Sequence, residues 1–279
     1  MIALLTLTLV LAGQGSGYHW SGTVAEGKQV SVKNIIGDIR VEPSTGRRVE
    51  IVAVKTTGKH GRAEDVEIRR VETAGGIEVC VIYPGTGTDD GDCDWSSHDD
   101  RGRGNSERND TRVAFTLKVP SGISLQVHTV AGDVLVRGAR GDVSAASVSG
   151  DVELSDVTAG SLEAQTVSGD VTLRGIDAAE VEAQTVSGDV IYQGQIRARG
   201  DYSFQTLSGD VELLIPAATN AEVSGSTFSG SIRSDLPITS TASGRRGSRK
   251  RISGTLGTGR GAEMNLESFS GNVQIRALP

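Results

Sequence analysis

Apolar side chains recur at fixed distances from a repeated glycine through the second half of the chain. The phrase Ala-Gln-Thr-Val-Ser-Gly-Asp-Val occurs identically at 164–171 and 183–190, and its core Ser-Gly-Asp-Val recurs at 149–152 and 208–211. Successive glycines of this series lie 18, 19, 19, 21 and 21 residues apart, and one more follows after a longer gap. They are Gly132, Gly150, Gly169, Gly188, Gly209, Gly230 and Gly271. A fixed period of roughly twenty residues is typical of a solenoid, in which each coil buries its apolar side against the next.

The apolar positions of each repeat predict two strands joined at a corner. Around Gly169, apolar residues stand two and four positions later, at Val171 and Leu173, and seven and five positions earlier, at Leu162 and Ala164. This alternation indicates strands with one buried face. Because the apolar positions change from odd to even distances, the chain must turn near the Thr-Val-Ser step. We also expect the apolar residue two positions before each glycine in the stacked core. These residues are Val130, Val148, Val167, Val186, Leu207, Phe228 and Phe269.

The same spacing fits once more around Gly37, which predicts a first coil near the N-terminus. Strand-like segments at 49–55, 66–71, 77–83 and 112–119 lack the Gly-Asp phrase, and they are either degenerate coils or an antiparallel insertion. Segment 85–111 is polar with almost no apolar residues, which predicts a flexible loop. Segment 243–261 predicts an irregular basic connection. It carries the basic residues Arg245, Arg246, Arg249, Lys250 and Arg251.

The prediction is therefore an all-β fold, a single-stranded parallel β-solenoid (β-helix) over 18–279 with coils of about 19–21 residues. Composition agrees, because 37 Gly, 6 Pro and 4% aromatic residues describe a turn-rich β protein. The net charge of -7 argues against a nucleic-acid partner, since phosphate binding needs a surplus of Lys and Arg on one face. Anionic membrane surfaces are disfavoured for the same reason.

Two features predict export to the periplasm, the cell surface or the extracellular space. Residues 1–12 form a short apolar run followed by small residues, so 1–17 is expected to be a signal peptide, although the usual positive charge before the run is missing. The run is too short to span a bilayer. The only two cysteines, Cys80 and Cys93, flank a polar stretch that a disulfide would close in an oxidising compartment. The alternative is two unrelated thiols.

The Gly-Asp steps predict a structural turn ladder. Glycine supplies backbone freedom at each corner, and the Asp caps neighbouring backbone groups. The alternative is a cation site, but carboxylates stacked roughly 5 Å apart in water repel by only ~0.8 kcal/mol per pair, so no metal is required. The ladder comprises Gly132, Asp133, Gly150, Asp151, Gly169, Asp170, Gly188, Asp189, Gly209 and Asp210. A second acidic cluster at 89–94 lacks the closing Glu and spacing of a Ca²⁺ loop and is expected to be a solvated loop.

No catalytic constellation is found, and no catalytic residue, cofactor or metal is predicted. His19, His60, His98 and His128 lack metal-ligand spacing, and no nucleophile elbow or phosphate loop occurs. The carboxylates of a ladder share one environment and do not make an acid and base pair. The chain is therefore expected to be a non-enzyme, with polysaccharide cleavage as a remote alternative.

The chain resembles the bacterial putative adhesin family of β-solenoid domains of unknown function. The resemblance rests on Val-Pro-Ser-Gly-Ile at 119–123, Thr-Val-Ala-Gly-Asp-Val at 129–134, the Thr-Val-Ser-Gly-Asp-Val coils and the closing Ser-Phe-Ser-Gly-Asn-Val at 268–273. It implies an exported parallel β-solenoid with no known catalytic residues to carry over. Related domains also occur in envelope-stress regulators.

We therefore expect a non-enzymatic, adhesin-like surface or envelope protein with a binding or structural role. The expected partner is a surface polymer or envelope protein, with self-association through the ends of the solenoid left open. The alternative is a regulatory module in envelope-stress signalling, which a neighbouring gene for a sensor kinase or an anti-sigma factor would favour.

Overall fold

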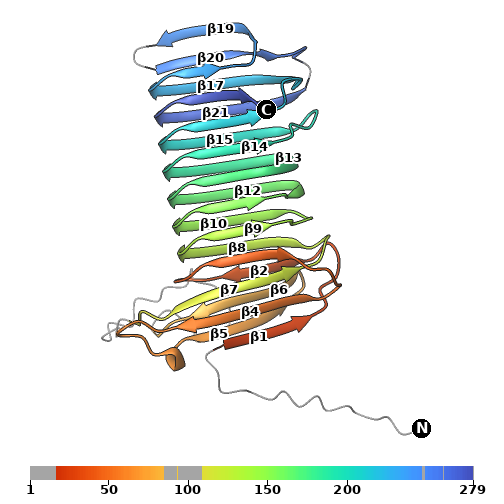
Figure 1. Cartoon of the computed structure of the whole chain (residues 1–279), viewed down its shortest axis with the longest axis vertical. Helices are drawn as coiled ribbons and strands as arrows, with labels where there is room; N and C mark the ends of the chain where they lie inside the picture. Colours follow the sequence, from red (N-terminus) through yellow and green to blue (C-terminus); the bar gives the residue numbers. More distant parts are fainter. Residues whose placement is uncertain (1–16, 85–92, 94–108, 247–248, 260, 279) are drawn as a thin grey trace, which may run out of the picture.

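The computed structural model describes residues 17–278 except 85–92, 94–108, 247–248 and 260. The expected all-β fold is confirmed: the described residues form 22 strands and one short 3-10 turn, Ala63–Asp65, without an α-helix. The strands stack into an elongated body with the N-terminal strands at one end (Figure 1). The predicted signal peptide at 1–17 lies outside the described residues except for Gly17. Most of the predicted loop at 85–111, including all four Asp residues of the acidic cluster at 89–94, also lies outside them.

Each coil of the repeating region contributes one strand to each of two sheets. Within each sheet, a strand pairs in parallel with the equivalent strand of the next coil, so that Ala145, Ala164 and Ala183 lie side by side. The first sheet contains β8 (Ser124–Ala131), β10 (Val143–Ser149), β12 (Thr158–Ser168), β15 (Asp201–Ser208), β21 (Ala262–Ser270) and β17 (Ala221–Ser229). The second contains β9 (Val134–Arg137), β11 (Val152–Ser155), β14 (Val190–Gly194), β16 (Val211–Ile215), β22 (Val273–Ala277) and β18 (Ile232–Ser234). The long β13 (Val171–Ser187) takes part in both sheets.

Most predicted core positions are confirmed, but one row is wrong. Residues seven and five positions before the glycine and two and four after it are buried, with few exceptions, and Tyr192, Tyr202 and Phe204 are fully enclosed. The residues two positions before the glycine are instead exposed. The inward-facing positions at seven and five residues before the glycine are followed by a third, at three residues before it, which holds a Thr or Ser. The apolar residue that comes next therefore points outward.

The coils at the C-terminal end do not stack in sequence order. β21 pairs with β15 on one side and with β17 on the other, so the last coil of the chain lies between two earlier ones (Figure 1). Beyond β17 lie β20 (Arg249–Leu256) and then β19 (Ile238–Arg246), both joined by antiparallel pairing. The expected irregular connection at 243–261 is therefore wrong over most of its length, because these residues complete the end of a sheet.

Antiparallel strands also close the N-terminal end. The predicted first coil is confirmed, since β2 (Gln29–Lys33) pairs in parallel with β8 and β3 (Ile39–Pro43) with β9. β6 (Gly76–Ile82) and β7 (Arg112–Val119) extend this coil outward in parallel. β4 (Val49–Thr56), β1 (Gly17–Gly22) and β5 (Glu67–Thr73) then pair antiparallel with β7, β4 and β6 respectively. The prediction of a purely parallel body over 18–279 is thus corrected at both ends.

Candidate functional site

The Gly-Asp corner is a close contact between successive coils. Gly169 has a φ of +147°, and a Cβ atom added to it would lie 2.3 Å from the carbonyl oxygen of Gly150. Only glycine tolerates both the left-handed backbone and the approach. The hydroxyl of Thr166, three residues earlier, donates a hydrogen bond of 2.9 Å to that same carbonyl oxygen. Equivalent bonds from Ser147, Thr185 and Thr206 explain why these polar side chains are buried.

The Asp of each corner links one coil to the next. The Asp151 carboxylate accepts a hydrogen bond of 2.9 Å from the backbone N–H of Asp170, and the Asp170 carboxylate accepts one of 2.8 Å from Asp189. At the end of the series Asn272 replaces Asp, and its side-chain oxygen accepts the N–H of Ser231 at 3.1 Å. Because equivalent strands of successive coils pair in parallel without a shift, the Gly and Asp residues of the ladder lie in one row along the stack. Each carboxylate thus has a backbone donor, which is a capping geometry.

A row of apolar side chains runs beside this ladder on the outside of the molecule. The seven residues are 37 to 53% exposed and occupy equivalent positions in successive coils. We call them the apolar row: Val130, Val148, Val167, Val186, Leu207, Phe269 and Phe228. Phe269 and Phe228 stack with ring centroids 4.9 Å apart and planes within 2° of parallel. These residues were expected in the core, but continued odd alternation along each strand places them outside.

A groove lies against the aromatic end of the apolar row. Its volume is about 330 Å³. Gln205 and Glu267 are paired across neighbouring strands, and Leu207 and Phe269 stand two residues after them, with a buried Thr or Ser between. This alternation places the apolar lining residues Leu207, Phe269 and Phe228 on one wall and Gln184, Gln205 and Glu267 on the other. Between the walls lie the buried hydroxyl side chains that bond to glycine carbonyls, such as Thr206. The amide nitrogen of Gln205 donates to Ser203 at 3.1 Å, which holds the side chain along its strand. The groove therefore has one apolar wall and one wall of amide and carboxylate groups.

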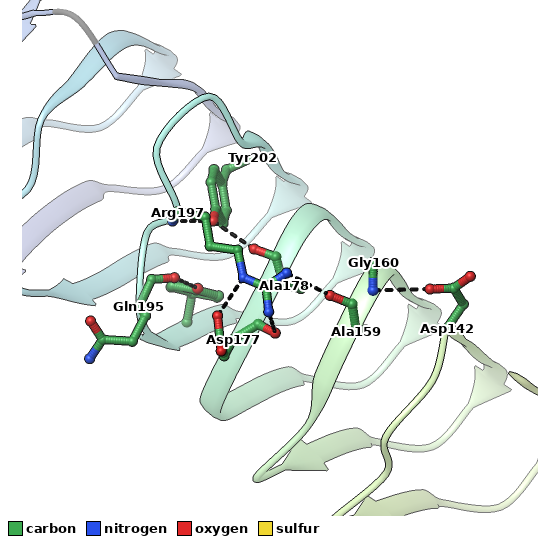
Figure 2. Close-up of polar contacts among 9 residues, drawn as sticks. Asp142, Ala159, Gly160, Asp177, Ala178, Gln195, Arg197 and Tyr202 are labelled. Atoms are coloured by element: carbon green, nitrogen blue, oxygen red, sulfur yellow. Dashed lines mark hydrogen bonds and ion pairs between the residues drawn. The ribbon is translucent and has the colours of Figure 1, made fainter. Parts of the chain in front are cut away.

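On another side of the stack, Arg197 joins three coils. Its Nε donates to the Asp177 carboxylate at 2.5 Å, and its terminal nitrogens donate to the backbone carbonyls of Asp177 and Ala159 at 3.0 and 3.1 Å (Figure 2). The hydrogen bond from Arg197 holds the pKa of Asp177 below its usual range. Tyr202 accepts the backbone N–H of Arg197 and donates to the carbonyl of Ala178, both at 2.8 Å. These hydrogen bonds tie the loop around Arg197 to two neighbouring coils, so we regard the cluster as structural.

The two cysteines meet at the N-terminal end of the molecule. Cys80 and Cys93 form a disulfide with their Cα atoms 5.7 Å apart, and both side chains are buried. Lys33 donates to the carbonyl of Cys93 at 3.2 Å and forms an ion pair of 2.7 Å with Glu78. His128 lies beside Lys33 and is half-buried, and burial and then the charge of Lys33 lower its pKa.

Among the described residues, no three His, Cys, Asp or Glu side chains converge as metal ligands would. Within the same residues, no helix has the length and apolar character needed to cross a membrane. The groove and the exposed apolar row beside it form a continuous feature of the described surface. Exposed apolar patches and grooves of this kind are typical of binding sites.

Several solved bacterial structures are similar to the chain, all at low identity and with TM-scores of 0.40 or below. One is described as a putative cell adhesion protein from Clostridium sporogenes, at 12% identity and a TM-score of 0.37, with 94% of this chain and 99% of that chain covered. Another is a putative adhesin from Bacteroides fragilis, at 12% identity and a TM-score of 0.40, with 94 and 97% covered. A third is a putative adhesin from Parabacteroides distasonis, at 11% identity and a TM-score of 0.34, with 95 and 98% covered. No curated protein matches the chain in sequence.

A family model gives a firmer assignment. The model described as Toastrack DUF4097 matches residues 96–276, which is more than half of the 279 residues. The matched segment includes all seven repeat glycines, from Gly132 to Gly271. This supports the expected resemblance to a family of β-rich domains of unknown function. The chain belongs to the Toastrack DUF4097 family.

Proposed function

We propose that this protein is an exported, non-enzymatic β-solenoid of the bacterial envelope or surface that binds an envelope polymer or protein along its side, as an adhesin does. The apolar row carries the proposal. Soluble proteins rarely expose a contiguous apolar patch of more than a few hundred Å² unless that patch binds something. A row maintained through seven coils, with buried polar residues directly before it, is a constant feature of the repeat.

Two further observations support the proposed solenoid architecture and the proposed export. The parallel pairing of equivalent strands from β8 to β17 supports a single-stranded parallel solenoid with coils of about 19–21 residues. The bond between Cys80 and Cys93 supports export, since disulfides persist in oxidising compartments. The Asp ladder serves the stack by capping backbone groups, so the binding surface is the row beside it.

Sedimentation with envelope fragments tests the proposed function. The purified protein is mixed with cell-envelope fragments that are untreated, protease-treated or periodate-treated, and the pellet is assayed for the protein. We expect the protein in the pellet with untreated fragments, and loss of binding after one of the two treatments. If the protein stays in the supernatant with untreated fragments, the proposed function is wrong. Release of sugar products during incubation would contradict the non-enzymatic part.

A further inference from the structure

We propose that the groove between Leu207, Phe269, Phe228 and the opposite wall of Gln184, Gln205 and Glu267 binds an uncharged linear glycan built of pyranose units. This inference deepens the proposed function and rests on it. It specifies the class of ligand and the end of the apolar row at which that ligand binds.

The two walls of the groove match the two sides of a sugar ring. A pyranose has C–H groups that bind apolar surfaces and hydroxyl groups that need hydrogen-bond partners. Leu207 and the two stacked phenylalanines provide the apolar wall, and the amides of Gln184 and Gln205 can donate to or accept from hydroxyl groups. The volume of about 330 Å³ lies at the lower end of the ~300–1,000 Å³ of small-ligand sites. It suits a short stretch of a longer chain.

Charge selects an uncharged ligand. The described residues that line the groove include one charged side chain, that of Glu267, and it is acidic. None of the described residues that line the groove is basic. A polyanionic glycan, a nucleic acid or an anionic lipid would therefore find no cationic partner there.

The spacing of the apolar row disfavours an extended peptide as the occupant. The row is one side chain wide and about half exposed, with one residue in each coil. An extended peptide rises ~3.3 Å per residue, which does not match coils spaced ~4.8 Å apart. A sugar unit is of the same order of length as one coil spacing, so a glycan can repeat its contacts from coil to coil.

Calorimetric titration with defined tetrasaccharides tests the inference. The probes are cellotetraose and chitotetraose, which are uncharged, and tetragalacturonate, which is acidic. We compare the natural protein with the Phe228→Ser/Phe269→Ser variant and with a matched control, Val130→Ser/Val148→Ser, which alters the same row away from the groove. All four side chains are substantially exposed, so both variants should fold, and circular dichroism and Tm check this.

The expected result is binding of at least one uncharged probe, a loss of at least about tenfold in the groove variant, and little change in the control. Binding that prefers tetragalacturonate, binding unaffected by the groove variant, or no binding of any probe would each overturn the inference. So would a dimer in sedimentation equilibrium that the groove variant dissociates. If the tetrasaccharides fail while envelope fragments bind through a protease-sensitive component, the glycan inference is wrong and the proposed function stands. If the untreated fragments also fail to bind, both are wrong.

Discussion

The ring centroids of Phe228 and Phe269 lie 4.9 Å apart with the planes parallel within 2°, although β18, β19 and β20 separate the two residues in the sequence. They are neighbours because β21 inserts between β15 and β17. The last coil of the chain therefore completes the aromatic end of the apolar row. The inserted β21 contributes Phe269 to one wall of the groove and Glu267 to the other, so the groove exists only when the C-terminal coil is in place.

The apolar row should contribute little to stability. Val167 is 47% exposed and Val171, four residues later, is fully buried. Val167→Ala should therefore change the free energy of unfolding by less than about 0.5 kcal/mol. Val171→Ala should reduce it by about 2 kcal/mol, because it removes buried methyl groups worth ~0.8 kcal/mol each and leaves a cavity. Urea denaturation of the two variants measures both, and equal losses would place Val167 back in the core.

The Asp ladder should tolerate Asn but not Ala. Asp170→Ala removes the acceptor for the N–H of Asp189 and should cost about 1 kcal/mol. Asp170→Asn keeps an acceptor oxygen, as Asn272 does naturally, and relieves repulsion of ~0.8 kcal/mol with each neighbour at roughly 5 Å. The Asn variant should thus be at least as stable as the natural protein at low salt. A rise in Tm on adding Ca²⁺ that Asp170→Asn abolishes would show a cation site instead.

The corner glycine should be irreplaceable. In Gly169→Ala the new methyl group would meet the Gly150 carbonyl oxygen at 2.3 Å with the backbone at φ +147°, and we expect a loss of at least about 2 kcal/mol. Gly46→Ala is the control, because the nearest atom to its added Cβ is 3.9 Å away and its φ is not positive. Urea midpoints of the two variants should differ clearly. A corner variant as stable as the control would contradict the observed stacking.

The disulfide should stabilise the N-terminal end. Cys80 and Cys93 are separated by 13 residues, and closing so short a loop contributes roughly 3 kcal/mol. Reductant should therefore lower the Tm, and the double variant Cys80→Ala/Cys93→Ala should melt at the same reduced temperature with or without reductant. Identical melting of the natural protein in oxidised and reduced buffer would rule out a stabilising bond.

Arg197 should make part of the stability depend on pH. The pKa of Asp177 is lowered in the folded protein from its ordinary value of 3.8 by the hydrogen bond from Arg197. The carboxylate therefore contributes stability that is complete above pH 3.8 and is lost as the pH falls through the lowered pKa. Since the two side chains are 36 and 48% exposed, screening limits this ion-pair contribution to about 1 kcal/mol or less.

The variant Arg197→Gln isolates this effect. The difference in unfolding free energy between it and the natural protein should be constant from pH 7 to about 5 and should narrow below pH 4, as expected for a depressed carboxyl pKa. Part of the difference should persist in acid, because Arg197 also donates to two backbone carbonyls. A difference that widens in acid would contradict the pairing with Asp177.

The repeat could be predicted from the sequence because each coil packs against a neighbouring coil with the same pattern of apolar positions. Positions such as Val171 and Leu173 are apolar in almost every coil, and local alternation alone places them inside. The hydrophobicity of Val167 alone wrongly predicts a core position, whereas continued alternation along the strand places its side chain outside. Its position depends on Thr166, whose hydroxyl is satisfied by a glycine carbonyl of the preceding coil. That contact joins residues of different coils.

The two ends of the molecule were less predictable. The insertion of β21 beside β15 depends on non-local pairing, and sequence order had suggested that the coil around Gly230 would follow directly. The basic strands β19 and β20 lack the alternation of a buried strand because they lie at the end of a sheet. The groove needs Phe228 and Phe269 side by side, so it could not be predicted without that order.

The most direct test of the binding surface is fluorine NMR of protein whose four phenylalanines are fluorinated. Phe228 and Phe269 lie in the groove, while Phe115 and Phe204 are buried and serve as internal controls. On titration with chitotetraose or cellotetraose, we predict saturable shifts of the Phe228 and Phe269 signals, with the Phe115 and Phe204 signals nearly unchanged. Resonances of Phe228 and Phe269 that stay fixed at saturating glycan, or that move no more than the buried pair, would contradict the glycan-binding groove.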